Sequence, residues 1–268
     1  MQKQICLNRK RVFKFLGMPV LIGMFFYHSG CETVSRDTLT IAASANMQYA
    51  MEELIARFKE ESGISCELIV GSSGKLTAQI VEGAPFDLFF SADMKYPRAI
   101  YEKGLTSGPP RIYAYGYLVF WSLDQGLELT NEGLLGEEVR HIATANPETA
   151  PYGRAAEDLL RGMGVYEKIE AKLVFGESVA QTNQFILSGT AEVGITALSV
   201  VSAPGAKGKG QWRAADATLY EPIAQGLVHL KQSDPEKEKW AREFDDFLRS
   251  QPAIDILHKF GYGLEKEE

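Results

Sequence analysis

The order of apolar runs and amphipathic segments between residues 39 and 103 predicts alternating strands and helices. Short uninterrupted apolar runs predict strands that are buried on both faces. Apolar residues three or four positions apart, such as Met51, Leu54 and Phe58, predict helices with one buried face. The predicted elements are, in order, Leu39–Ala43, Met47–Ser62, Cys66–Val70, Lys75–Glu82, Phe86–Ser91 and Lys95–Lys103. This alternation predicts a mainly parallel sheet that helices cover on both faces.

A second set of alternating elements follows and predicts a second α/β unit. Its predicted strands are Tyr115–Ser122, His141–Ala145, Lys172–Phe175 and Val193–Ala197, and its predicted helices are Ala155–Met163 and Val179–Ser188. The apolar run Ile223–Leu230 predicts a returning strand, and the predicted helices Glu236–Arg249 and Pro252–Phe260 close the chain. We therefore predict a two-lobed α/β fold. Lobe 1 comprises residues 38–113 and 225–268, lobe 2 comprises residues 114–224, and chain crossings near Tyr113–Gly116 and Pro222–Gly226 join them.

The N-terminal segment has the composition of a targeting sequence. A basic start, which includes Lys3 and Arg9, precedes the short apolar run Phe15–Tyr27, and this order predicts a secretory signal. The stretch from His28 to Cys31 resembles the bacterial lipobox, in which the cysteine is lipidated, although His28 stands where an aliphatic residue is usual. We predict a signal peptide with a lipobox over 1–31, lipidation of Cys31, and a polar tether over 32–37. Ordinary cleavage nearby and an uncleaved anchor are the alternatives.

Charge and cysteine content narrow the possible partners. The formal net charge of -7 argues against a nucleic-acid partner, which would need a basic face. The same charge repels anions, so any anion site must be built locally. If Cys6 is removed with the signal and Cys31 carries lipid, Cys66 has no partner for an intramolecular disulfide. We then expect Cys66 to be a small buried residue.

Four predicted strand-to-helix junctions offer hydrogen-bond donors, and ligands of open α/β sheets bind at such junctions. They are Ser44-Ala45-Asn46, Ser72-Ser73-Gly74, Pro151-Tyr152-Gly153 and Glu177-Ser178-Val179. The start of a helix carries unpaired N–H groups and a partial positive charge, so it binds an anion without a cationic side chain. Each junction taken alone is more often an ordinary helix cap than a binding site, and a lone tyrosine is more often a packing residue.

Three longer stretches carry a more specific pattern. They are Ala42–Asn46, Gly71–Leu76 and Gly83–Asp93, of which the last is the most specific. These stretches resemble the periplasmic molybdate-binding proteins of ABC importers. Pro151–Gly153, Glu177–Val179 and Val193–Ile195 follow at suitable intervals, so that the resemblance extends over Leu39–Gly263. The resemblance implies the type II periplasmic binding protein fold, with two lobes and the ligand in the cleft between them.

The resemblance also implies a ligand and the residues that bind it. Molybdate, or the closely similar tungstate, would be held by neutral hydrogen bonds, so that the protein contacts the metal only through its oxygens. By position, Ser44 and Ser73 would supply hydroxyl and amide donors, Ala45 or Asn46 a further donor, and Tyr152 and Val179 backbone amides from the other lobe. A fully ionised oxyanion needs only donors, which agrees with these residue types.

The sequence departs from the family pattern at one position, and the matching stretches include two carboxylates. Many members place a donor tyrosine where Ala197 stands here, and Tyr152 is the candidate to compensate through its hydroxyl or its amide. Asp87 and Asp93 belong to the match, but a carboxylate that faces a dianion would repel it. We therefore interpret both carboxylates as structural.

Residue types and resemblance together predict a binding protein and no enzyme. The four histidines lack metal-ligand spacing, and the chain has neither a nucleophile elbow nor a phosphate-binding loop. We predict no catalytic residue, no cofactor, and a monomer that serves an ABC permease. Its expected location is the periplasm or, as a lipoprotein, the extracytoplasmic face of the membrane. The alternatives are a site for another tetrahedral oxyanion such as sulfate, an α/β enzyme acting on a small anionic substrate, and a sensing module that docks to a receptor.

Overall fold

The computed structural model describes residues 38–231 and 234–264. The predicted signal peptide and lipobox over 1–31, with Cys31, and the tether over 32–37 lie outside these residues. Within the described part of the chain, no helix combines the length and apolar composition that a membrane span requires.

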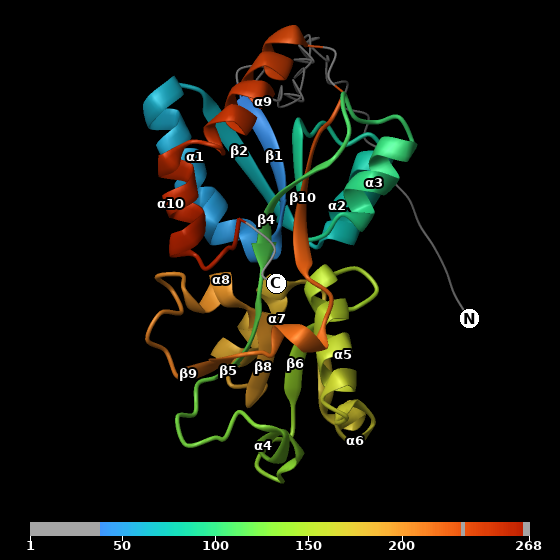
Figure 1. The fold of residues 1–268 in the computed structure, drawn as a ribbon, viewed down its shortest axis with the longest axis vertical. Coiled ribbons are helices and arrows are strands. Elements are labelled where there is room, and N and C mark those ends of the chain that lie inside the picture. Colours follow the sequence, from blue (N-terminus) through green and yellow to red (C-terminus); the bar gives the residue numbers. More distant parts are fainter. Residues whose placement is uncertain (1–37, 232–233, 265–268) are drawn as a thin grey trace, which may run out of the picture. The chain divides into compact units, whose positions relative to one another are not determined.

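The first sheet has five strands in the order β2-β1-β3-β10-β4 (Figure 1). They are β1 (Thr38–Ser44), β2 (Ser65–Gly71), β3 (Leu88–Ser91), β4 (Arg111–Gly116) and β10 (Ile223–His229). β1 pairs in parallel with β2 and β3, whereas β10 is antiparallel to β3 and β4. The strands β1, β2 and β3, from which a mainly parallel sheet was predicted, are parallel, but β10 and β4 make the complete sheet mixed. The reason is that β10 returns from the second sheet, so no helical crossover fixes its direction.

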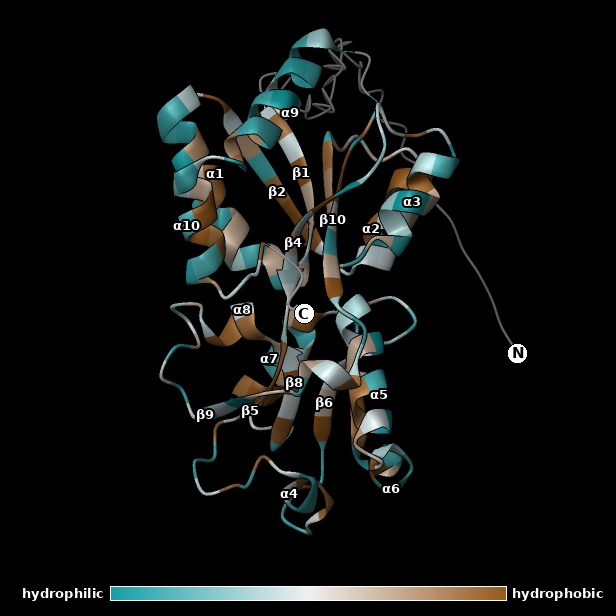
Figure 2. Ribbon diagram, viewed as in Figure 1, coloured by the Kyte–Doolittle hydropathy of each residue, from teal (hydrophilic) through white to brown (hydrophobic). Residues whose placement is uncertain are grey.

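Alternate residues of these strands face two separate apolar cores. The helices α1 (Gln48–Ser62), α9 (Pro235–Phe247) and α10 (Gln251–Lys259) cover one core, and α2 (Ser73–Val81) and α3 (Lys95–Glu102) cover the other. In β1, Ile41 and Ala43 pack into the first core, whereas Ala42 packs into the second. Figure 2 shows largely apolar strands between helices whose outer faces are mostly hydrophilic. The alternation of Ile41, Ala42 and Ala43 between the two cores is the period-two pattern of a strand buried on both faces.

The second sheet also has five strands, in the order β7-β6-β8-β5-β9. They are β5 (Leu118–Ser122), β6 (Ile142–Ala145), β7 (Leu173–Gly176), β8 (Val193–Ala197) and β9 (Gln211–Ala214). β6 is parallel to β7 and β8, and β5 is antiparallel to β8 and β9. The α-helices of this part are α4 (Asn131–Leu135), α5 (Pro151–Gly162), α6 (Tyr166–Ile169), α7 (Val179–Leu187) and α8 (Leu198–Val201). The two separate sheets confirm the predicted two-lobed α/β fold.

The chain changes sheet at a point that the apolar pattern does not mark. The single strand predicted over Tyr115–Ser122 is in fact two strands, because β4 ends at Gly116 in the first sheet and β5 begins at Leu118 in the second. From Tyr113 to Ser122 the residues of both strands are mostly buried, so periodicity alone cannot separate the strands. The chain returns to the first sheet at Ile223. The exact limits of the two lobes stay a prediction.

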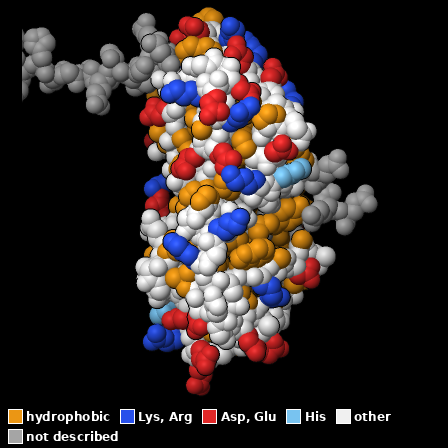
Figure 3. Space-filling view, turned by 90° about the vertical axis from the view of Figure 1, so that its left-hand side faces the viewer, with side chains coloured by type: hydrophobic (Ala, Val, Ile, Leu, Met, Phe, Trp, Pro, Cys, Tyr) orange, Lys and Arg blue, Asp and Glu red, His pale blue; other side chains and the backbone are white. Residues whose placement is uncertain are grey.

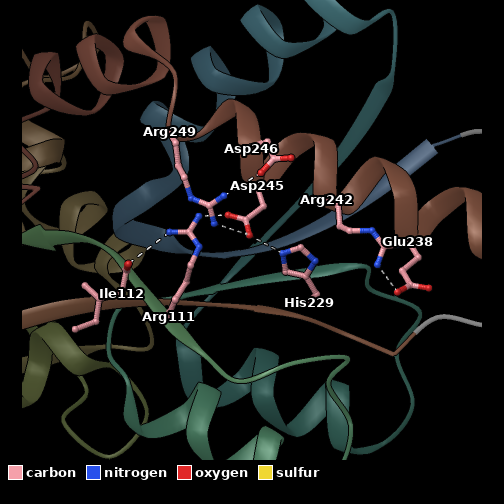
Figure 4. Close-up of polar contacts among 8 residues, drawn as sticks. All are labelled: Arg111, Ile112, His229, Glu238, Arg242, Asp245, Asp246 and Arg249. Carbon is pink, nitrogen blue, oxygen red and sulfur yellow. Dashed lines mark hydrogen bonds and ion pairs between the residues drawn. The ribbon is translucent and has the colours of Figure 1, made fainter.

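A charged cluster of Arg111, His229, Asp245 and Arg249 fastens α9 to the first sheet (Figure 4). Asp245 on α9 accepts a hydrogen bond from Arg111 of β4, and its other oxygen lies 3.0 Å from His229 Nε2 of β10 and 3.3 Å from Arg249 Nη2. Burial alone would raise the pKa of Asp245, but the hydrogen bonds from His229 and Arg111 lower that pKa to about 2. The carboxylate is therefore ionised and fixed. We call these four residues the Asp245 cluster.

Candidate functional site

The four junctions singled out from the sequence meet at one small cavity of about 10 Å³. Every predicted ligand-binding residue borders it, and none of the described residues in its lining carries a formal charge at neutral pH. The lining residues are Ser44, Ala45, Asn46, Ser72, Ser73, Ala92, Ala150, Pro151, Tyr152 and Val179. Ser44 and Ser73 belong to segments that leave the first sheet, whereas Tyr152 and Val179 belong to helices of the second. The cavity therefore lies where the two sheets present their helix starts to each other.

Ser73 is the first residue of α2 and is completely buried. The preceding Ser72 caps the helix by accepting a hydrogen bond from Lys75 N. The Ser73 hydroxyl oxygen accepts from Ala92 N at 3.0 Å, which fixes its position at the cavity wall. A hydroxyl that accepts in this way can still donate its own proton. The geometry thus suits a donor to an anion.

The segment after β1 is a 3-10 turn over Ala45–Met47 with its polar groups in a buried network. Ser44 Oγ donates to Asn46 Oδ1 at 2.8 Å. Asn46 Nδ2 donates to Gln225 Oε1 and to Tyr262 Oη, both at 2.9 Å. The backbone carbonyl oxygen of Asn46 accepts hydrogen bonds from Tyr262 Oη at 2.9 Å and from Ser199 Oγ at 2.7 Å. The Asn46 side chain is therefore engaged with protein groups, so a further donor from this turn would be a backbone N–H.

Tyr152 lies in the first turn of α5, directly after Pro151 at the first helical position. Ala150, the residue before the helix, gives no side-chain cap. The Tyr152 side chain is buried, and burial raises the pKa of its phenol well above the ordinary value. Its hydroxyl has no hydrogen bond of normal geometry among the described residues. The hydroxyl lies beside the chain crossing, because a Cβ atom added to Gly116 would come within 2.0 Å of it.

Val179 begins α7 and is 4% exposed. Ser178 precedes it as the helix cap and accepts from Gln181 N. Both second-sheet helices thus aim their first N–H groups towards the cavity that Ser44 and Ser73 border from the first sheet. Helix starts attract anions through these N–H groups and the helix dipole.

The other residues discussed from the sequence lie away from the cavity lining. Asp87 is fully buried and accepts from Thr40 N at 2.6 Å and from Lys237 Nζ at 3.2 Å, so that it joins β1 to α9. Ala197 is buried at the end of β8. Burial, and to a smaller extent the nearby Asp87 carboxylate, raise the pKa of the Cys66 thiol to about 12. A thiol with this pKa is unreactive at neutral pH.

Sequence reasoning missed the residues that hold the Asn46 turn from a distance. Gln225, Tyr262 and Ser199 reach Asn46 from β10, from the segment after α10 and from α8. Tyr262 is brought there because Gly263 pairs with Tyr115 in two backbone hydrogen bonds. No local pattern marks these side chains, because their contacts span more than 150 residues of sequence.

Comparison with known proteins agrees with this geometry. A family model described as bacterial extracellular solute-binding protein matches residues 39–263. The molybdate-binding protein ModA of Rhodobacter capsulatus is 37% identical over 225 residues, which cover 84% of this chain and 87% of the relative. The solved periplasmic molybdate-binding protein of Azotobacter vinelandii is 35% identical with a TM-score of 0.79, over 85% of this chain and 100% of that chain.

A third relative is named as a lipoprotein. The putative ABC transporter substrate-binding lipoprotein YvgL of Bacillus subtilis is 28% identical over 88% of this chain and 90% of its own length. Together these matches confirm the resemblance predicted from the sequence motifs, and they agree with the two-lobed fold.

Proposed function

Because this chain belongs to the bacterial extracellular solute-binding protein family, we propose that it captures molybdate or tungstate outside the inner membrane and delivers it to an ABC importer. The observation that carries the proposal is the uncharged cavity at which helix starts from both sheets meet. The relatives from Rhodobacter capsulatus and Azotobacter vinelandii, both described as molybdate-binding proteins, support the choice of ligand.

The proposed ligand set follows from the donors around the cavity. Ser73 donates from the first lobe, and so does Ser44 once ligand binding turns its hydroxyl proton away from Asn46 Oδ1. The amides of Tyr152 and Val179 donate from the second. We assign the further donor of the Ala45–Asn46 turn to a backbone N–H, because the Asn46 side chain already bonds Gln225 and Tyr262. A fully ionised tetrahedral dianion such as molybdate carries no proton and accepts all of these bonds, whereas monohydrogen phosphate, which keeps a proton, would need an acceptor. Among the described residues, no carboxylate lines the cavity.

Binding in such a cleft requires movement of the lobes. We propose that lobe 1 (residues 38–113 and 225–268) and lobe 2 (114–224) open and close about the crossings near Tyr113–Gly116 and Pro222–Gly226. A ligand that contacts both lobes shifts the population towards the closed form, which the permease recognises. We propose further that the protein works as a monomer, carries no cofactor, and performs no catalysis.

The proposed location is the periplasm or, through a lipid on Cys31, the extracytoplasmic face of the membrane. The basic and apolar N-terminal segment supports export, and the description of YvgL as a lipoprotein supports the anchor. Cys31→Ser is expected to move the protein from the membrane fraction to the soluble fraction and to abolish lipid labelling. Lipid labelling that continues in this variant would refute the anchor.

A calorimetric titration with four anions tests the proposed ligand. Molybdate and tungstate are expected to bind tightly, and sulfate and phosphate much more weakly. Sulfate has the same charge and shape as molybdate but is smaller, so this comparison isolates the size of the cavity. Tight sulfate binding without a response to molybdate would replace the ligand, and the absence of all four responses would overturn the proposal.

A further inference from the structure

Two ion pairs join elements of the first sheet to elements of the second next to the cavity. Asp93, which follows β3, pairs with Arg154 of α5, and Lys75 of α2 pairs with Glu177, which precedes α7. On the side of the first sheet, the first pair supplies the carboxylate of Asp93 and the second pair supplies the ammonium group of Lys75. The two pairs therefore have opposite polarity across the same cleft.

Both pairs adjoin the walls of the cavity. Each of the four charged residues is one or two positions from a lining residue, Asp93 from Ala92 and Lys75 from Ser73, for example. A groove of about 360 Å³ that includes Lys75 and Glu177 shares Ser72 with the cavity. A groove of about 250 Å³ that includes Asp93 and Arg154 shares Ala92 with it. The cavity thus adjoins two grooves, and one ion pair lines each of them.

Neutral contacts between the sheets accompany the ion pairs. Gly74 N donates to Thr149 O at 2.9 Å, and Tyr96 Oη donates to Glu148 O at 3.2 Å. The Arg154 guanidinium also lies 5.5 Å from the centre of the Tyr96 ring. These contacts require the two lobes to be in their present alignment, so they report the closed cleft.

The charged groups are held in position before they pair. Asp93 Oδ1 accepts from Tyr96 N and from Ser91 Oγ, both at 3.2 Å. Arg154 Nη1 donates to Pro147 O at 3.2 Å. Pairing across the cleft therefore costs less side-chain entropy than it would between two free side chains. The Asp93 and Arg154 side chains are 18% and 30% exposed, whereas those of Lys75 and Glu177 are more than half exposed.

We propose that the Asp93–Arg154 and Lys75–Glu177 pairs form a latch that aligns the lobes and prolongs the closed state around the bound anion. This inference rests on the proposed function of the cleft. Each lobe presents one positive and one negative group, so only one alignment pairs both, and a misaligned closure brings like charges together. Because both pairs form only when the lobes are aligned and are absent from the open form, they favour the closed form. The Asp93–Arg154 pair carries the larger share, because exposed ion pairs contribute little.

The test measures two rates in the full chain, one with an anion and one without. Release of radiolabelled molybdate into excess tungstate reports the lifetime of the closed complex. Exchange of the Gly74 amide hydrogen with solvent, followed by nuclear magnetic resonance without any anion, reports opening of the empty cleft. Asp93→Asn and Arg154→Gln are each expected to raise both rates about fivefold, and Lys75→Gln about twofold or less.

A charge exchange and a matched control separate the latch from a general loss of structure. The double variant Asp93→Arg with Arg154→Asp is expected to bring the molybdate release rate and the Gly74 exchange rate most of the way back to those of the unaltered protein. In a double-mutant cycle, the effects of Asp93→Asn and Arg154→Gln on these rates are expected not to add. Lys259→Gln breaks the Lys259–Glu53 pair, which lies entirely on helices of the first sheet, and is expected to change neither rate. Circular dichroism checks that each variant is folded.

The proposal is overturned if Asp93→Asn and Arg154→Gln leave the Gly74 exchange rate unchanged or if their effects simply add. Failure of the proposed function gives a different result. In that case the unaltered protein binds no oxyanion, while the exchange measurement still shows whether the pairs hold the cleft closed.

Discussion

The Asp245 cluster and the candidate cavity both surround negative charge, but they do so with opposite chemistry. In the cluster, Arg111, His229 and Arg249 surround a carboxylate that belongs to the protein (Figure 4). In the cavity, the walls are uncharged hydroxyls, amides and apolar groups. A fixed carboxylate never leaves its partners, so cations can hold it permanently. An exchangeable anion must leave, and a buried cation left without its partner would cost several kcal/mol.

The cavity avoids that cost even though charged groups lie close to it. Arg154 is two residues from Tyr152 but pairs with Asp93, and Lys75 is two residues from Ser73 but pairs with Glu177. Figure 3 shows acidic and basic side chains dispersed over one face of the molecule, with no large area of one sign. The difference between the two regions teaches that neutral donors suit an anion that must come and go. The following predictions test this comparison, beginning with the largest expected effect.

Placing a charge in the neutral cavity is expected to have the largest effect. Ser73→Asp would add a carboxylate at a completely buried position, where it would occupy the helix-start donors itself and repel the ligand. We expect molybdate affinity to fall about 1,000-fold or more, which corresponds to about 4 kcal/mol. Calorimetry measures the affinity, and a melting curve checks folding. Ser73→Asn, which adds similar bulk without charge, is expected to bind more tightly than Ser73→Asp; equal affinities would contradict a role for charge.

Removal of a single neutral donor is expected to have a smaller effect. Ser73→Ala deletes the hydroxyl that Ala92 N holds at the cavity wall. Loss of one hydrogen bond to a charged group costs about 1.5–3 kcal/mol, so the dissociation constant for molybdate should rise about 10- to 100-fold in calorimetry. Ser62→Ala removes a serine hydroxyl that bonds Phe58 O, away from the cavity, and should leave affinity unchanged. Unchanged affinity in Ser73→Ala would remove this hydroxyl from the ligand set.

The Asp245 cluster is expected to affect stability and leave anion affinity alone. Asp245→Asn should lower the free energy of unfolding at neutral pH by about 1–2 kcal/mol, because Arg111 and His229 lose an ionised partner. The pKa of Asp245 is lowered to about 2, so its contribution is present above the ordinary carboxyl pKa near 4 and is lost as the pH falls towards 2. Denaturant titrations between pH 2 and pH 7 measure this difference.

Asp246, the residue next to Asp245, provides the control for the denaturant titrations. Asp246 also pairs with Arg249, but its side chain is 77% exposed. Asp246→Asn is therefore expected to change stability very little at any pH. Equal changes in the free energy of unfolding for Asp245→Asn and Asp246→Asn would contradict the role assigned to burial and to the contacts of Asp245 with Arg111 and His229.

The residues that border the cavity could be predicted because their signal is local. Ser44, Ser73, Tyr152 and Val179 each follow a strand and stand at the start of a helical segment, and the structure brings all four to one cavity. The core strands and long helices could be predicted for the same reason, since a period of two or 3.6 residues is visible in a short window. Helices of four residues such as Tyr166–Ile169 and Leu198–Val201 are too short to show a period.

What could not be predicted depends on contacts between distant residues. The antiparallel direction of β10 and the division of Tyr115–Ser122 between two sheets are set by pairing across the whole chain. The same is true of the Asn46 side chain, which the sequence alone offers as a free donor but which Gln225 and Tyr262 engage. Neither partner is recognisable until the fold brings β10 and the segment after α10 against the first turn.

The smallest expected effect concerns the Tyr152 hydroxyl, which lies beside Gly116 at the chain crossing. Tyr152→Phe keeps the backbone amide and the buried ring, so molybdate affinity in calorimetry should change about twofold or less. The melting temperature should stay the same or rise slightly, because the variant removes a buried hydroxyl that makes no hydrogen bond of normal geometry among the described residues. Tyr262→Phe is the contrasting control, because its hydroxyl accepts from Asn46 Nδ2 and donates to Asn46 O, so stability should fall by about 1 kcal/mol. A tenfold loss of affinity in Tyr152→Phe would show that the phenol, and not only the amide, donates to the anion.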